Sequence, residues 1–62
     1  MVTNYRVKLV IGKELSRATV ADGKGWARTL KEAEEMFASV VKKTSNILQA
    51  ELYFNNQLIK KR

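Results

Sequence analysis

The 62-residue chain contains neither cysteine nor histidine, and this limits how so short a chain can hold a fold. A domain of about 60 residues buries only about 60% of the surface that its unfolded chain exposes. Disulfides, bound metals or partner subunits therefore often supplement a core of this size. Without Cys or His, disulfides and the usual zinc and iron sites are excluded. We expect one small basic domain over residues 1–62, without metal or cofactor, that relies on consistent local structure or self-association.

The composition is that of a globular, strongly basic protein. Hydrophobic residues make up 45% of the chain and charged residues 29%. Twelve Lys and Arg residues against six Asp and Glu give a net charge of +6, which favours a polyanionic partner. No apolar stretch approaches the length of a transmembrane helix, and the N-terminal residues lack the pattern of a secretory signal. We therefore expect a cytoplasmic protein.

Side chains suited to catalysis are scarce. Histidine and cysteine supply the commonest general base and the best nucleophile, and the chain has neither. Three of its six carboxylates, Glu32, Glu34 and Glu35, fall in one stretch that the start of a helix explains. We therefore expect a binding protein and not an enzyme.

The N-terminal part predicts a hairpin. Residues 5–11 alternate apolar and basic side chains through Leu9, the period-two pattern of a half-buried strand. Gly12-Lys13 predicts a two-residue turn, and residues 15–21 predict the second strand.

This hairpin implies a definite register. With two loop residues, Val7 lies opposite Ala18 and Lys8 opposite Arg17, and apolar and polar residues fall on separate faces. A four-residue loop would separate the faces equally well.

A loop and a helix follow. Residues 22–28 are rich in glycine and predict a loop. Thr29 and Glu32 form a T-x-x-E capping box, after which apolar residues recur at helical spacing, so we expect a helix over residues 30–44.

The C-terminal part predicts more sheet. Asn46 is suited to a left-handed cap, and residues 47–54 alternate as a third strand. Asn55-Asn56 predicts a turn, after which residues 57–60 offer a short fourth strand. The order β-β-α-β with a possible last β predicts a two-layer α+β domain, an antiparallel sheet with one helix packed on one face.

The positive charge is concentrated outside the helix. Residues 1–28 carry a net charge of +4, residues 29–46 carry none, and residues 47–62 carry +2. Strand alternation places Arg6, Lys8 and Arg17 on the sheet face away from the helix, together with Tyr53. Lys8 opposite Arg17 is a destabilising like-charge pair that a bound anion would relieve.

A cationic antiparallel face with an aromatic ring is one known way to hold a nucleic-acid strand, because phosphates pair with cations while bases stack on rings. Equally, long basic side chains keep an open face soluble, and Glu51 on the same face counts against a pure phosphate-binding surface. Our leading hypothesis is a non-enzymatic protein that binds the backbone of DNA or RNA. Its candidate residues are Arg6, Lys8, Arg17, Lys24, Trp26, Arg28 and Tyr53.

Two interpretations of Trp26 remain open. It follows Lys24 and precedes the helix, so it is placed to stack on a base beside an anion-attracting helix end. A lone tryptophan at such a position more often folds back as a plug over one end of the core, and we favour the plug.

The alternative function is a protein-binding module. Val10 and Leu15 are expected on the same face as the cations, and exposed apolar patches mark partner surfaces. The partner would be a host protein or a second copy, with dimerisation through the edge formed by the second or last strand.

Several short runs together resemble the small uncharacterised proteins of bacteriophage and prophage genomes; they are Tyr5-Arg6-Val7, Gly12-Lys13-Glu14, Thr29-Leu30-Lys31-Glu32-Ala33-Glu34 and Asn55-Asn56-Gln57-Leu58-Ile59-Lys60. This resemblance implies a strand-strand-helix-strand fold and a non-enzymatic accessory protein that binds a host protein or nucleic acid inside the host cell.

The same Thr29–Ala33 run is similar to the helix start in the N-terminal arm-DNA-binding domain of phage integrases, where a basic antiparallel sheet precedes the helix. This chain departs from that pattern, with two expected strands instead of three before the helix and sheet after it. No integrase binding residue is carried over.

Overall fold

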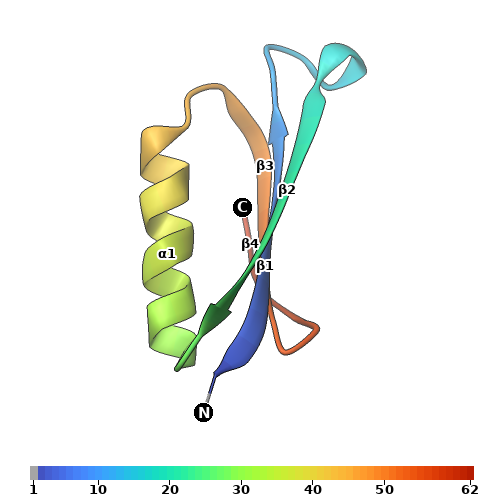
Figure 1. Cartoon of the computed structure of the whole chain (residues 1–62). Helices are drawn as coiled ribbons and strands as arrows, with labels where there is room; N and C mark the ends of the chain where they lie inside the picture. Colours follow the sequence, from blue (N-terminus) through green and yellow to red (C-terminus); the bar gives the residue numbers. More distant parts are fainter. Residues whose placement is uncertain (1) are drawn as a thin grey trace.

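The structure, a computed structural model that describes residues 2–62, is a four-stranded antiparallel sheet with one helix packed on one face (Figure 1). The strands lie in the order β2-β1-β3-β4. The elements are β1 (Thr3–Ile11), the short 3-10 helix η1 (Leu15–Arg17), β2 (Thr19–Ala27), α1 (Leu30–Lys43), β3 (Ile47–Phe54) and β4 (Gln57–Lys61). This confirms the expected α+β class. Within the described residues, no helix is long and apolar enough to cross a bilayer.

The helix begins at the predicted capping box. The hydroxyl oxygen Oγ1 of Thr29 accepts a hydrogen bond from the backbone N–H of Glu32 at 3.1 Å, which satisfies one of the first-turn donors. The helix ends one residue earlier than expected, because Thr44 leaves the helical conformation and caps it. Both the N–H and the hydroxyl of Thr44 donate to the carbonyl of Val40.

Asparagines make the turns of the C-terminal half. Asn55 and Asn56 have φ of 54° and 63°, and positive φ at both central residues defines the type I′ turn that suits a two-residue hairpin. Asn46, after the helix, has φ of 61°. These values confirm the predicted left-handed conformation at Asn46 and the predicted turn before β4.

The first hairpin differs from the prediction. The second strand is not residues 15–21 but Thr19–Ala27, and the glycine-rich segment expected to be a loop belongs to it. The connection is not a two-residue turn, because η1 lies within it. Residues paired between β1 and β2 have numbers that add up to 30 throughout, from Thr3 with Ala27 to Ile11 with Thr19, whereas the expected register adds up to 25.

Glycine at position 25 is required by this register. A Cβ atom built on Gly25 would lie 2.5 Å from the Tyr5 hydroxyl oxygen, so the Tyr5 side chain occupies the space that any other residue would fill. The same register puts Lys8 opposite Asp22, where the predicted register put it opposite Arg17. At Lys8, cross-strand attraction therefore replaces cross-strand repulsion, whereas the same register sets Lys24 opposite the cation Arg6.

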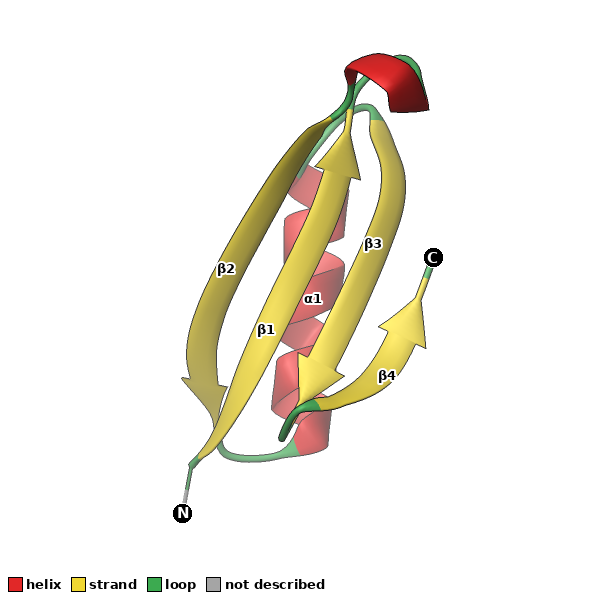
Figure 2. Cartoon of the chain, turned by 90° about the vertical axis from the view of Figure 1, so that its right-hand side faces the viewer, coloured by secondary structure: helices red, strands yellow, loops and turns green. Residues whose placement is uncertain are grey.

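The core lies between the helix and the two central strands. Phe37 of α1 packs with Val7 and Leu9 of β1 and with Ala50 and Leu52 of β3, and all five are buried. Figure 2 shows the helix behind the sheet, so the opposite face is uncovered. On the helix side, Ala21 and Gly23 of β2 remain exposed, because Phe37, the helix residue of the core cluster, packs against the central strands.

The two glycines of β2 provide a matched test of this packing. Gly25→Ala should lower the free energy of unfolding by about 1–2 kcal/mol, because the new methyl group forces the Tyr5 ring from its place. Gly23→Ala should be neutral or stabilising by about 0.5 kcal/mol, since a Cβ there meets nothing within 4 Å and the unfolded chain loses freedom. Urea unfolding at equal protein concentration measures both. Equal effects of the two substitutions would contradict the close contact at Gly25.

Candidate functional site

The observed register gathers a defined set of side chains on the uncovered side of the sheet. Residues directly opposite each other in an antiparallel pair share a face, so the pairings of β1 fix which side chains of its neighbours lie there. We call this surface the open face. It consists of Asn4, Arg6, Lys8 and Val10 of β1, Val20, Asp22, Lys24 and Trp26 of β2, Gln49, Glu51 and Tyr53 of β3, and Leu58 and Lys61 of β4.

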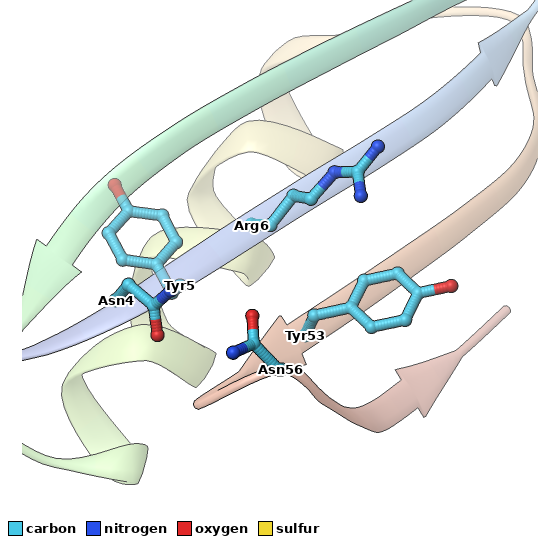
Figure 3. Close-up of a pocket in the computed structure, with 5 residues that line it drawn as sticks. All are labelled: Asn4, Tyr5, Arg6, Tyr53 and Asn56. Carbon is cyan, nitrogen blue, oxygen red and sulfur yellow. The ribbon is translucent and has the colours of Figure 1, made fainter.

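An ion pair lies at the centre of the open face. The Nε of Arg6 donates to both carboxylate oxygens of Asp22, at 2.9 and 3.1 Å, and its Nη2 also donates to Oδ2. The guanidinium carbon lies 5.9 Å from the centroid of the Tyr53 ring, within the range of a cation–π interaction. Figure 3 shows Arg6 and Tyr53 extending in the same direction from neighbouring strands. Arg6 is thus held between a carboxylate and an aromatic ring.

The ion pair shifts the titration of both partners. The hydrogen bond from Arg6 lowers the pKa of Asp22 from its ordinary value of 3.8, with further help from the charges of Arg6, Lys24 and Lys8 against an opposing effect of desolvation. The hydrogen bond to Asp22 in turn raises the pKa of Arg6. Asp22 is therefore ionised at neutral pH and is a counter-charge for its cationic neighbours.

Two aromatic side chains belong to the open face, one on each side of β1. Trp26 is 67% exposed and lies opposite Asn4, so the favoured interpretation of this residue as a core plug is wrong. Its neighbour Ala27 points to the helix side and is fully buried instead. Tyr53 is half-buried, and its hydroxyl donates to Oε2 of Glu51 at 3.3 Å. Trp26 therefore offers an exposed indole ring, whereas Tyr53 is held by its neighbours.

A small pocket adjoins Tyr53 at the end of the sheet near the β3–β4 turn. It has a volume of about 110 Å³ and is lined by Asn4, Tyr5, Arg6, Tyr53 and Asn56 (Figure 3). Two side-chain amides and a guanidinium offer both donors and acceptors there. The pocket has room for a few water molecules or a small polar group.

The predicted site residues are only partly brought together. Arg6, Lys8 and Tyr53 share the open face as expected, and Lys24 joins them from what was expected to be a loop. Arg17 does not, because it belongs to η1 in the connection beyond the sheet.

Two of the predicted residues, Arg17 and Arg28, lie outside the sheet. Arg17 has its Nε 3.7 Å from a carboxylate oxygen of Glu14, so its described partner is a near neighbour in the chain. Arg28 is exposed in the short segment between β2 and α1. The expected cluster of Arg6, Lys8 and Arg17 is therefore replaced by one of Arg6, Lys8 and Lys24.

The two apolar residues of the alternative hypothesis are also separated. Val10 is half-buried on the open face, directly opposite Val20, which is 56% exposed. Leu15 is 64% exposed but lies in η1, so the expectation that it shares a face with Val10 is wrong.

Asp22 and Val20 were missed as members of the site because the strand that carries them was misplaced. A signal for this strand is nevertheless present in the sequence. Between residues 20 and 27, larger side chains alternate with Ala or Gly, which is the period of a strand with one crowded and one open face. The glycines obscured this pattern, since they are also typical of loops.

No known protein family, curated protein or solved structure matches this chain. We therefore base the function on the residues of the open face.

The Arg6–Asp22 pair predicts a pH dependence. Because the pKa of Asp22 is lower in the folded than in the unfolded protein, the pair stabilises the fold above the unfolded-state pKa, and this stabilisation is lost as the pH falls through the folded-state pKa. Asp22→Asn should therefore be less stable than the wild type at neutral pH, and the difference should vanish in strong acid. Urea unfolding at a series of pH values measures this.

Glu35→Gln is the matched control, because Glu35 is exposed and takes part in none of the ion pairs found within residues 2–62. It should change stability little at any pH. A stability difference for Asp22→Asn that persists unchanged into strong acid would contradict the role of the ion pair.

Proposed function

We propose that the protein binds single-stranded DNA or RNA across the open face, mainly through the phosphate backbone and without strong base preference. The observation that carries the proposal is the exposed ring of Trp26 on the same uncovered surface as Arg6, Lys8 and Lys24. Cations attract the phosphates, and an exposed ring stacks on a base of any identity.

The geometry suits an extended single strand. Trp26 on β2 and Tyr53 on β3 are separated by β1, which puts roughly 10 Å across the sheet between their strands. Arg6 and Lys8 of β1 lie between these two strands. Only unpaired bases can splay out and stack on protein rings, so a single strand fits this surface better than a duplex.

The positive charge lies outside the helix, and the open face carries part of it. The helix segment, residues 29–46, carries no net charge, whereas the remainder carries the whole excess of +6. The open face itself holds the cations Arg6, Lys8, Lys24 and Lys61 against the carboxylates Asp22 and Glu51. Its affinity for phosphates should accordingly be moderate and sensitive to salt.

Trp26 makes binding directly observable, because it is the single tryptophan of the chain. Titration with an oligothymidylate should quench its fluorescence as a base stacks on the indole ring. If about three phosphates are neutralised, the logarithm of the affinity should fall with the logarithm of salt concentration at a slope of about −2. A salt-independent affinity, or no quenching at saturation, would refute the proposal.

Substitutions separate stacking from charge. Trp26→Ala should weaken binding of a labelled oligonucleotide by about 5- to 100-fold, as loss of one stacked base predicts. Leu15→Ala is the matched control, since Leu15 is equally exposed but lies beyond the sheet. Lys24→Glu should also weaken binding, whereas Lys43→Glu on the helix should not. Fluorescence anisotropy measures oligonucleotide binding by all four variants. If the two variants of either pair weakened binding equally, the assignment of the open face as the binding surface would be contradicted.

A protein partner is the second candidate, and the Val10–Val20 pair on the open face favours it. Together with Leu58, which is 49% exposed, these residues give the surface an apolar component beyond what phosphate binding needs. The resemblance to phage accessory proteins would make the partner a host protein. Val20→Ser should abolish such a complex and leave oligonucleotide binding intact. Lys24→Glu should weaken oligonucleotide binding more than it weakens the protein complex.

A further inference from the structure

The two edges of the sheet are built differently. β4 has five residues, its pairing with β3 shifts between Leu52 and Tyr53, and it carries Lys60 and Lys61. Short length, irregularity and lysines are the features by which natural edge strands avoid pairing with other chains. β2 has nine residues, pairs with β1 without any shift and contains no proline. Figure 2 shows its outer edge uncovered, so β2 is open to a further strand.

We infer that two copies of this chain pair through β2, antiparallel and centred on Gly23, to form one continuous eight-stranded sheet. The sequence of β2 is complementary to itself about this centre. Asp22 of each copy lies opposite Lys24 of the other, and Val20 lies opposite Trp26. Opposite charges and aromatic–β-branched pairs are among the cross-strand pairs that stabilise antiparallel sheets. The two-fold axis makes each pair occur twice.

Neighbouring registers that keep both open faces on one side are unfavourable. A centre on Asp22 would put the two Asp22 carboxylates opposite each other, and a centre on Lys24 would put the two ammonium groups opposite each other. Around Gly23, in contrast, Ala21 meets Gly25 on the helix side, where small residues allow close approach. Of these three registers, the charges favour the one centred on Gly23.

The pairing changes the charges around Lys24 most. Within one chain it lies directly opposite Arg6, another cation, and Arg6 occupies the Asp22 carboxylate. None of the ion pairs found within residues 2–62 includes Lys24. Asp22 of the second copy, which also accepts from its own Arg6, would add a second carboxylate directly opposite Lys24. Self-association also suits a core in which Leu52 is the largest fully buried side chain.

This inference goes beyond nucleic-acid binding and does not depend on it. The pairing brings the open faces of the two copies onto the same side of one sheet, which doubles the surface available to any ligand. Self-association is measured in the absence of nucleic acid, so its failure is distinct from a failure to bind oligonucleotides.

Sedimentation equilibrium of the full chain should give twice the mass of the 7.1 kDa monomer. Lys24→Asp should raise the dissociation constant of the dimer by about tenfold or more. The reason is that it sets two carboxylates opposite each other at each of the two charge pairs. The same substitution faces Arg6 within its own chain, so the fold should be preserved. Lys42→Asp on the helix is the control and should leave the dimer intact. A monomeric wild type, or equal dimerisation of the Lys24→Asp variant, would overturn the inference.

Cysteine cross-linking tests the register itself, because the chain has no cysteine of its own. Gly23→Cys places two thiols across the axis, on strands whose Cα atoms are about 4.5–5.5 Å apart, within disulfide range. A side chain is tolerated there, as a Cβ meets nothing within 4 Å. In Ala21→Cys, on the same face, the two thiols lie about 13 Å apart along the strands. Mild oxidation should link the first variant and not the second. Equal linkage of both would contradict the centre on Gly23.

Discussion

The pairing of β1 with β2 is the constraint on which the rest of the molecule depends. The Tyr5 ring occupies the space above Gly25, and this contact fits one register of the hairpin. That register turns Lys24 and Trp26 away from the helix and brings Asp22 within hydrogen-bond distance of Arg6. A shift by an odd number of residues would exchange the two faces of β2 and remove all three side chains from the open face.

The two sides of the sheet have separate roles. The helix side holds the small core around Phe37 and Leu52, and the helix segment is electrically neutral. The open face combines cations with carboxylates, and Asp22 and Tyr53 restrain the guanidinium of Arg6. Such restraint lowers the entropy lost when a side chain engages a ligand. The carboxylates thus contribute to the order of the face while they reduce its net charge.

The C-terminal half could be predicted from local sequence patterns. The register of the first hairpin could not, because it involves a contact between residues far apart in the sequence. The capping bond of Thr29 and the positive φ of Asn55 and Asn56 depend on residues within one turn, so the sequence pattern located them. Gly25 is required by the ring of Tyr5, a residue on another strand, and its loop propensity gave no hint of this. The wrong position of the second strand placed Arg17 in the predicted site and concealed the exposure of Trp26.

Nuclear Overhauser effects between backbone protons of β1 and β2 test the central claim most directly. In a chain of 7.1 kDa these contacts are readily assigned, and close cross-strand proton pairs occur between directly opposed residues. Our account predicts contacts between Tyr5 and Gly25 and between Lys8 and Asp22. Contacts between Lys8 and Arg17 would show instead that the hairpin closes in the shorter register, which would contradict the open face described above.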